Sequence, residues 1–137
     1  EEEEEYPEYD LSGIHFLMAE DNELNAEIAT TMLEMSGAKM TVASNGQEVI
    51  SMFENAPQGT YQFILMDINM PVLNGYEATR KIRALSKEDA RKIPILALTA
   101  NAFNEDKKEA LAAGMNGHVS KPIDMNVLMK QVKRLLQ

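Results

Sequence analysis

Several polar side chains of this chain stand directly after short apolar runs, at the points where buried strands would end. They are Glu20, Asp21, Asp67, Thr99 and Lys121. Carboxylates gathered with one hydroxyl and one ammonium group are suited to holding a cation and a phosphoryl group together. The first question is therefore whether the fold brings these side chains to one place.

Their combined chemistry is restrictive. The carboxylates of Glu20, Asp21 and Asp67 would repel one another at close range, and one or two would protonate unless a cation lay among them. Mg²⁺, or Mn²⁺ in its place, prefers oxygen ligands, and Mg²⁺ keeps waters that phosphate oxygens can replace. Lys121 adds a mobile positive charge and Thr99 a hydroxyl donor. Asp67 is the predicted nucleophile, since aspartate forms acyl phosphates and phosphoryl transfer needs mainly positioning and charge neutralisation.

Each of these residues also has a simpler interpretation. A lone Asp67 after a buried strand would often be a turn or cap residue, and Glu20 and Asp21 could cap the helix that follows. Thr99 could be a helix N-cap, and Lys121 could be an ordinary surface lysine. Their coincidence at successive strand ends favours the functional interpretation.

Short apolar runs alternate with amphipathic stretches from Leu11 onward, which predicts a parallel sheet with helices on both faces. The predicted strands are 14–19, 40–43, 63–66, 95–98 and 118–120. In open α/β sheets, ligands bind outside the carboxyl ends of the strands, so the polar side chains are expected to converge there.

The first predicted helix is expected to bury one apolar stripe and to end at Gly37. That stripe consists of Leu24, Ile28, Thr31, Met32 and Met35. Further helices are predicted to carry Val49, Ile50 and Phe53, then Tyr76, Thr79 and Ile82, then Leu111, and last Leu128, Val132 and Leu135. Gly114 is expected to close the fourth helix and Asp124 to cap the fifth.

The length of 137 residues fits one domain, and the absence of cysteine excludes disulfides and thiolate metal sites. No apolar run approaches the roughly 20 residues of a membrane span, and the acidic start is unlike a signal peptide. We therefore expect a cytoplasmic domain that makes no membrane contact. The chain begins with Glu1, which we interpret as a fragment of a longer protein, with processing as the alternative.

The net charge of −9 is concentrated at the start of the chain, because residues 1–10 hold seven acidic residues and no base. Residues 11–137 carry 15 acidic and 13 basic residues, a net charge of −2. We predict that residues 1–10 are a disordered acidic linker, with a docking segment as the alternative, and that residues 11–137 form the domain. The nearly neutral domain argues against nucleic acid as a partner.

Four motifs, in this order, resemble those of the response-regulator receiver family of two-component signalling. They are AEDN at 19–22, MDINMP at 66–71 with NG at 74–75, LTA at 98–100 and SKP at 120–122. The resemblance covers residues 11–137, and the set is far more specific than any one motif. It implies a flavodoxin-like (βα)5 fold with strand order 2-1-3-4-5 and Asp67 as phosphoacceptor.

The resemblance also assigns metal ligands. It implies that Asp21, Asp67 and the backbone carbonyl of Asn69 bind Mg²⁺. Glu20 would act directly or through a water molecule. Lys121 would contact the phosphoryl oxygens together with Thr99.

Three further positions follow from the same resemblance. Thr99 would move toward the phosphoryl group, and an aromatic residue on the last strand would then turn inward. His118 stands at that switch position in place of the commoner Tyr or Phe. The peptide bond before Pro122 is expected to be cis.

Longer stretches at 19–25, 75–79 and 97–102 resemble the receivers at the C-terminal end of bacterial hybrid sensor histidine kinases. Such receivers take a phosphoryl group from a histidine and often pass it to a histidine phosphotransfer domain. The kinase itself could be membrane-anchored. A free-standing single-domain regulator is the alternative.

Other functions fit the sequence less well. A degenerate receiver would be a protein-interaction module that has dropped phosphate chemistry, yet every chemical residue is present. A phosphohydrolase of the haloacid dehalogenase type usually has a second Asp two residues after its nucleophile, where this chain has Asn69. A flavodoxin-like flavin carrier would have a hydroxyl- and glycine-rich loop in place of Glu20-Asp21. Nucleotide binding would require a glycine-rich motif, which the sequence lacks.

Overall fold

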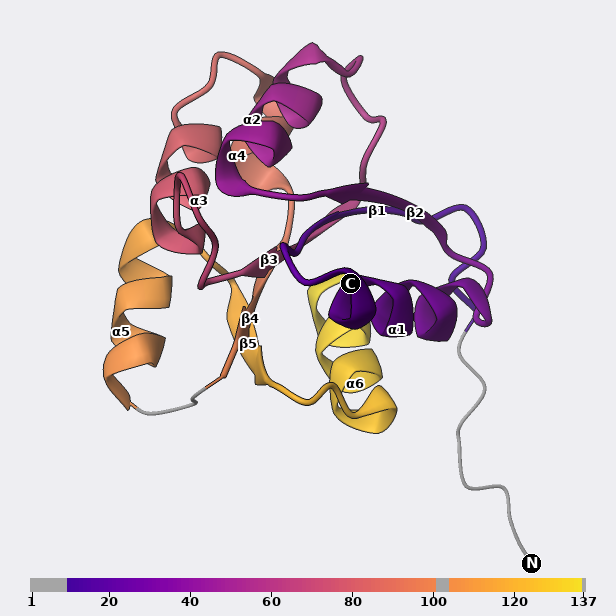
Figure 1. Cartoon of the computed structure of the whole chain (residues 1–137). Coiled ribbons are helices and arrows are strands. Elements are labelled where there is room, and N and C mark those ends of the chain that lie inside the picture. The colour runs from indigo at the N-terminus through magenta and orange to yellow at the C-terminus, as the bar shows by residue number, and fades with distance from the viewer. Residues whose placement is uncertain (1–9, 101–103, 137) are drawn as a thin grey trace, which may run out of the picture.

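A computed structural model describes residues 10–100 and 104–136 of the chain. Most of the predicted acidic linker lies outside the described residues, as do Asn101 and Ala102 of the 97–102 motif. The strands are β1 His15–Ala19, β2 Lys39–Ala43, β3 Phe63–Asp67, β4 Ile95–Thr99 and β5 Gly117–Ser120. They form one parallel sheet in the order β2-β1-β3-β4-β5 (Figure 1). The predicted fold class and strand order are confirmed.

Helices cover both faces of the sheet. They are α1 Glu23–Glu34, α2 Gly46–Asn55, α3 Gly75–Arg83, α4 Glu88–Lys92, α5 Asn104–Ala113 and α6 Met125–Leu136. Figure 1 shows α1 and α6 on one face, with α2, α3 and α5 on the other. Among the described residues, no helix has both the length and the apolar character needed to span a bilayer.

The short helix α4 was not predicted. Its five residues, EDARK, bury only Ala90, so the segment carries no apolar periodicity that a sequence pattern could reveal. It lies between α3 and β4, so the described part of the chain has one helix more than the five expected from the strand–helix alternation.

Two apolar layers sandwich the sheet, because side chains alternate between its faces along each strand. Leu17 and Ile64 pack with α2, α3 and α5 on one side. Phe16 and Leu65 pack with α1 and α6 on the other. Every residue of β3 and of β4 is buried, as expected for central strands of a parallel sheet. These two rigid strands carry Asp67 and Thr99 at their ends.

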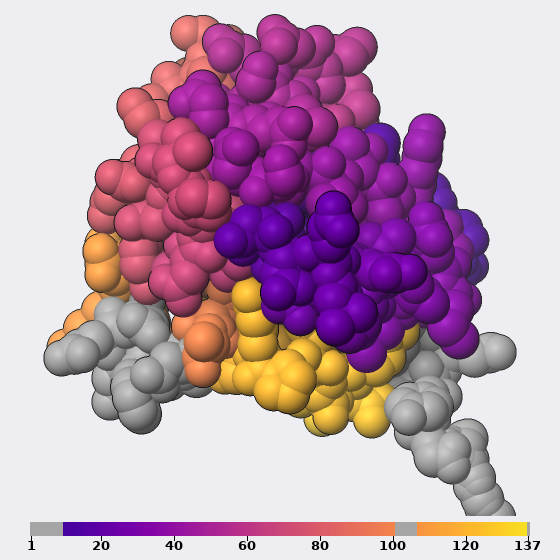
Figure 2. Space-filling view, in the orientation of Figure 1, coloured from indigo at the N-terminus to yellow at the C-terminus, as the bar shows by residue number. Residues whose placement is uncertain are grey.

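The prediction for α1 was wrong about which stripe is buried. Leu24 and Met35 are 65 % and 82 % exposed. The buried residues are instead Ala26, Ala29 and Leu33. Small alanines let a helix lie close to the sheet, and Leu33 fills the remaining space, so this stripe packs better than the bulkier one. Figure 2 shows α1 beside α6, with its outer surface facing the viewer.

The predicted helix ends at Gly37 and Gly114 and the predicted cap at Asp124 agree with the structure. Gly37 follows α1 with a φ of 95° and Gly114 follows α5 with a φ of 108°, a left-handed conformation that glycine adopts readily. The Asp124 carboxylate accepts a hydrogen bond of 3.1 Å from the Val127 amide at the start of α6. These local signals fix where the helices start and stop, and hence the lengths of the loops at the site.

Candidate functional site

The carboxyl ends of the strands gather the predicted polar residues. Glu20 follows β1, Asp67 and Thr99 end β3 and β4, and Lys121 follows β5. Glu20, Asp67 and Thr99 are 3 %, 1 % and 2 % exposed. Since burying a charged group is unfavourable unless it is paired, two nearly inaccessible carboxylates at one sheet edge indicate a site with a dedicated cation.

The turn after β1 places its two acidic residues differently. Glu20 points into the protein, and its Oε2 accepts a hydrogen bond of 3.2 Å from the Asn22 amide. Asp21 is exposed. Asn22 then caps α1, its Oδ1 accepting a hydrogen bond of 3.0 Å from the Asn25 amide. Because α1 begins immediately afterwards, the Glu20–Asp21 pair is held at the rim of the sheet.

The loop after β3 begins on the Asp67 side chain. Asp67 Oδ1 accepts a hydrogen bond of 3.2 Å from the Asn69 amide, while the Asn69 side chain is exposed. The Ile68 amide continues the sheet by donating to the Leu98 carbonyl at 3.0 Å. The carboxylate therefore stands on a backbone fixed from the neighbouring strand. The role of the Asn69 carbonyl as a metal ligand stays a prediction.

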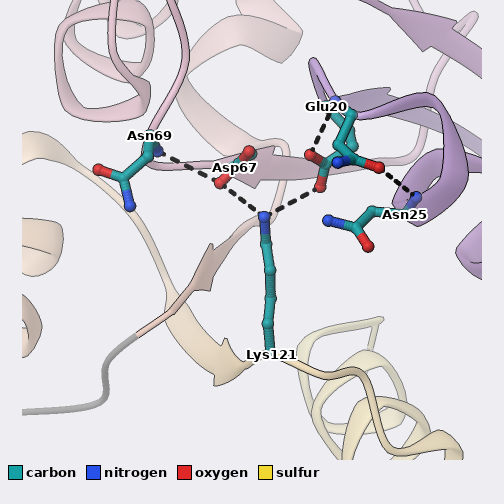
Figure 3. A network of polar contacts seen from close by, with 6 residues as sticks. Glu20, Asn25, Asp67, Asn69 and Lys121 are labelled. Atoms are coloured by element: carbon teal, nitrogen blue, oxygen red, sulfur yellow. Dashed lines mark hydrogen bonds and ion pairs between the residues drawn. The ribbon is translucent and has the colours of Figure 1, made fainter.

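Lys121 connects the two buried carboxylates. Its Nζ lies 3.1 Å from Asp67 Oδ1 and 3.2 Å from Glu20 Oε1, and Figure 3 shows the side chain reaching up between them. The Lys121 amide donates to the Thr99 carbonyl at 2.7 Å, which ties the start of this side chain to the end of β4. The ammonium group thus already compensates the charge of the two buried carboxylates.

Burial and charge pull the proton equilibria of this cluster in opposite directions. Burial, followed by the nearby Glu20 carboxylate, raises the pKa of Asp67 to about 7, and Lys121 only partly opposes this. Burial by itself would lower the pKa of Lys121, but the Asp67 and Glu20 carboxylates outweigh it and raise the pKa. A carboxylate held in this way gains from any additional cation placed beside it.

The same cluster fits a hard divalent ion. Glu20, Asp21 and Asp67 each offer a carboxylate oxygen, and these oxygens all lie within 4.8 Å of one another. An all-oxygen donor set with an exposed member suits Mg²⁺ or Mn²⁺, which bind few protein groups and keep waters. The buried Glu20 Oε1 accepts no hydrogen bond among the described residues, although it lies 3.2 Å from Lys121 Nζ. The donor set therefore has unsatisfied capacity that a metal ion would use.

The remaining predicted residues lie around this centre. Thr99 is the last residue of β4 and is aligned with Ser120 of β5. The Lys121–Pro122 peptide bond is cis, as the family resemblance implies. His118 is half-buried on β5 and lines a surface cavity of about 360 Å³ together with Pro122 and Val127. The structure thus places Thr99 at the strand ends with the carboxylates and His118 deeper along β5.

One structural contributor, Gly75, entered the sequence analysis only as part of the family motif at 74–75. Gly75 begins α3, and a Cβ atom there would overlap the Asp67 carbonyl oxygen and lie 2.8 Å from Ile68 Cα. Glycine at this position lets α3 approach the backbone of the nucleophile. Its direct sequence signal is an Asn-Gly pair at a helix start, eight residues after the strand-ending aspartate.

Comparison with protein families places these residues in a known context. The sequence profile of the response regulator receiver domain matches residues 16–133. Hybrid signal transduction histidine kinases I and B of Dictyostelium discoideum are 36 % and 38 % identical to the chain, over 85 % and 88 % of its length. Histidine kinase 1 of Arabidopsis thaliana is 33 % identical over 91 % of the chain. The chain spans 6–13 % of the length of these curated relatives.

Solved structures agree with these relatives. The receiver domain of sensor histidine kinase PA1611 from Pseudomonas aeruginosa is 38 % identical, with a TM-score of 0.81 over 91 % of this chain and 98 % of that one. That crystal structure has a magnesium ion coordinated in the active-site cleft. The receiver domain of Ssk1 from Saccharomyces cerevisiae, co-crystallised with the histidine phosphotransfer protein Ypd1, is 32 % identical. Its TM-score is 0.79, over 89 % of this chain and 88 % of that one.

Proposed function

The chain belongs to the response regulator receiver domain family, and on this premise we propose that Asp67 accepts a phosphoryl group from a phosphohistidine in a Mg²⁺-dependent step. The observation that carries the proposal is the Asp67 carboxylate itself. It is 1 % exposed, and it lies beside an ammonium group and two further carboxylates. A buried aspartate has little reason to occupy such surroundings for stability alone.

In the proposed reaction an Asp67 carboxylate oxygen attacks the phosphorus atom. A P–O bond forms as the P–N bond of the donor breaks, and its electron pair stays on the imidazole nitrogen. Mg²⁺ bound by Glu20, Asp21 and Asp67 would neutralise charge on the phosphoryl oxygens. Lys121 is close enough to Asp67, at 3.1 Å, to follow the new phosphoryl group and stabilise its charge.

Release of the existing ion pairs is part of this proposal. While Lys121 bridges Glu20 and Asp67, its charge compensates the carboxylates; once a divalent ion does so, the ammonium group is free to bind phosphoryl oxygens. Thr99 would contribute its hydroxyl group from the end of β4. Its displacement, with inward movement of His118, is the proposed route from the phosphorylated site to the outer surface.

The proposed partners are histidine-containing domains. Relatives of this chain are hybrid histidine kinases, and one receiver of similar structure was crystallised with a histidine phosphotransfer protein. By analogy we propose that a kinase phosphohistidine domain is the donor and that a phosphotransfer domain is an acceptor. The domain, residues 11–137, would then be a cytoplasmic phosphoacceptor tethered by the acidic residues 1–10, rather than a stand-alone enzyme.

The direct test is phosphorylation by a small-molecule donor in the presence of Mg²⁺, followed by intact mass. We expect a gain of one phosphoryl group that is lost in Asp67→Asn and when the metal is chelated. Glu109→Gln, on the exposed surface of α5, is a control that should leave the gain unchanged. A gain that persists in Asp67→Asn would show that another residue is the nucleophile.

A further inference from the structure

Two helices of this protein begin with the same pattern, Asn-Gly-x-Glu, at residues 45–48 and 74–77. In each, the Asn side chain caps the helix by accepting a hydrogen bond from the Glu amide, at 2.8 Å in α2 and 2.9 Å in α3. The cap needs the Asn, but it does not need glycine at the next position. Neither Gly46 nor Gly75 has a left-handed φ, so backbone conformation does not explain the glycines either.

Close approach of backbone segments does explain them. A Cβ atom on Gly46 would overlap the Leu73 carbonyl oxygen and lie 2.7 Å from Leu73 Cβ. Gly75 faces the Asp67 carbonyl in the same manner. Figure 1 shows α2 and α3 side by side on one face of the sheet. The segment from Asp67 to Leu73 is therefore held against the first turns of both helices, although α2 is far from it in sequence.

This segment contains a strained turn. Val72 has a φ of 72°, and the Leu73 amide donates to the Pro71 carbonyl at 2.8 Å across it. A β-branched residue is a conformational outlier at positive φ, and such outliers persist only where surrounding contacts fix them. The Val72 side chain is 74 % exposed, so its own packing does not hold the turn. The residue next to Val72 that surrounding contacts hold in place is Leu73, which lies against Gly46.

The strained turn is connected to the site through a short closed loop. The Gly75 amide donates to the Ile68 carbonyl at 2.8 Å, which joins the two ends of the loop directly after Asp67. Asn69 lies within this loop, and its amide binds the Asp67 carboxylate. A shift at Leu73 would therefore be transmitted to the groups that are proposed to hold the metal ion.

We propose that Gly46 is a positioning residue for the Asp67 loop. Without a side chain there, the first turn of α2 supports the Leu73 carbonyl, keeps the turn at Val72 in its strained form, and so places Asp67 and Asn69 for Mg²⁺. This inference rests on the proposed function of Asp67. Gly46 touches neither metal nor phosphoryl group and acts through Leu73.

The test compares Mg²⁺ affinity in the unmodified protein and in Gly46→Ala. Mg²⁺ alone is titrated while the amide signals of Asp67 and Asn69 are followed by NMR. Because Mg²⁺ demands nearly ideal octahedral geometry, we expect the dissociation constant of the folded variant to rise about tenfold. An equal dissociation constant, within twofold, would overturn the inference and leave the proposed function intact.

Gly59→Ala is the matched control. Gly59 has a φ of 84°, and a Cβ atom there would meet nothing within 4 Å, so alanine strains the backbone without touching the site. We expect this variant to lose stability while binding Mg²⁺ like the unmodified protein. If it weakened Mg²⁺ binding as much as Gly46→Ala, general destabilisation would account for both results and the inference would fail.

A measurement on the unmodified protein covers the case in which Gly46→Ala does not fold. Mg²⁺ binding should also move the amide signals of Gly46 and Leu73, while that of Lys130 on α6 stays unchanged. Shifts at Asp67 and Asn69 without shifts at Gly46 and Leu73 would overturn the inference alone. No Mg²⁺ binding at any of these residues would overturn the proposed function together with it.

Discussion

Lys121 and Arg83 each have a partly buried, positively charged side chain that contacts segments distant in the sequence. The two side chains differ in the groups that they bind. Lys121 bridges two carboxylates, Glu20 and Asp67. Arg83 binds neutral oxygens: its Nε and Nη2 donate to the Gly114 carbonyl at 3.0 and 2.8 Å, and its Nη1 donates to the Ala90 carbonyl at 2.9 Å. Nη2 also reaches Asn116 Oδ1 at 2.9 Å.

The Lys121 contacts belong to the candidate site, whereas the Arg83 contacts form a structural link between segments, which we call the Arg83 staple. Carbonyl oxygens do not titrate, so a change of pH does not alter the acceptors that Arg83 of α3 meets at Ala90 in α4 and at Gly114 after α5. The partners of Lys121 are titratable and can be claimed by a metal ion or a phosphoryl group, so its contacts can be exchanged. Burial lowers the pKa of Arg83, yet a guanidinium remains charged throughout the neutral range. Cation burial alone therefore does not identify the site, whereas the nature of the acceptors does.

Removing the Lys121 ammonium group should have the largest effect. In Lys121→Met we expect the rate of phosphorylation of Asp67 to fall about 1,000-fold, the upper range for losing one group that stabilises transition-state charge. Time-resolved intact mass at saturating Mg²⁺ measures it. Lys130→Met, on the exposed side of α6, serves as the control. A rate within threefold of the unmodified protein would place Lys121 with Arg83 as a structural cation.

Arg83→Met should instead act on stability. The substitution leaves several partly buried oxygens without their donor, and we expect the free energy of unfolding to fall by about 3 kcal/mol. Urea unfolding measures the loss, and Arg80→Met, exposed on the same helix, should change little. The Mg²⁺ dissociation constant of the folded protein should be unchanged. A large rise in that constant would show that the staple is coupled to the site after all.

The pH dependence should come from the site and not from the staple. The pKa of Asp67 is raised to about 7 from its usual 3.8, so the folded state holds this proton more tightly than the unfolded state does. Stability from this group is therefore greatest at low pH and is lost as the pH rises from about 4 to about 7. The raised pKa of Lys121 acts only in alkali: its contribution persists to the unfolded value of 10.5 and is lost above it.

Mg²⁺ sharpens the same prediction, because protons and the metal compete for Asp67. We expect the apparent Mg²⁺ dissociation constant to rise about tenfold for each pH unit below 7. Calorimetric titrations at pH 6, 7 and 8 provide the measurement, with Arg83→Met following the unmodified protein. An affinity independent of pH across this range would mean that Asp67 is already ionised well below pH 7.

The smallest effect is expected at a third cation, Lys87. Its Nζ donates to the Phe53 and Ala56 carbonyls, at 2.8 and 2.5 Å, beside the C-terminal end of α2. Like Arg83 it binds neutral acceptors, but it uses one mobile ammonium group instead of a planar fork. Lys87→Met should lower the free energy of unfolding by about 1 kcal/mol and leave phosphorylation unchanged. If Lys87→Met lowered the free energy of unfolding as much as Arg83→Met, the number of fixed hydrogen-bond donors would not determine how much such a contact stabilises the fold.

Much of this architecture could be read from local patterns. Continuous apolar runs predict strands such as β3 because a central strand is buried on both faces. The residues that end those runs predict the site, since parallel strands end at one edge. Gly37 and Asp124 marked helix ends through their local backbone chemistry. Each of these signals involves residues close together in the chain.

Other features of the fold depend on which segments, distant in the sequence, pack against a given element. The residues of α1 form two apolar stripes, and the larger one, with Leu24 and Ile28, was preferred in the sequence analysis. The structure instead buries Ala26 and Ala29 with Leu33 in the core on that face of the sheet. Helix α4 was not predicted because it has one buried residue, Ala90, and a single apolar position cannot show a helical repeat. Both outcomes depend on surfaces contributed by remote segments.

The sequence by itself determined the alternation of strands and helices, the order of the motifs and the chemical types at the strand ends. Only the tertiary structure decided that Glu20 is buried while Asp21 is exposed, that Lys121 bridges Glu20 and Asp67, and that Gly46 lies against Leu73. The physical reason is that propensity, capping and hydrophobic period are properties of neighbours in the chain. Burial, ion pairing and close approach are properties of groups that meet only after the chain has folded.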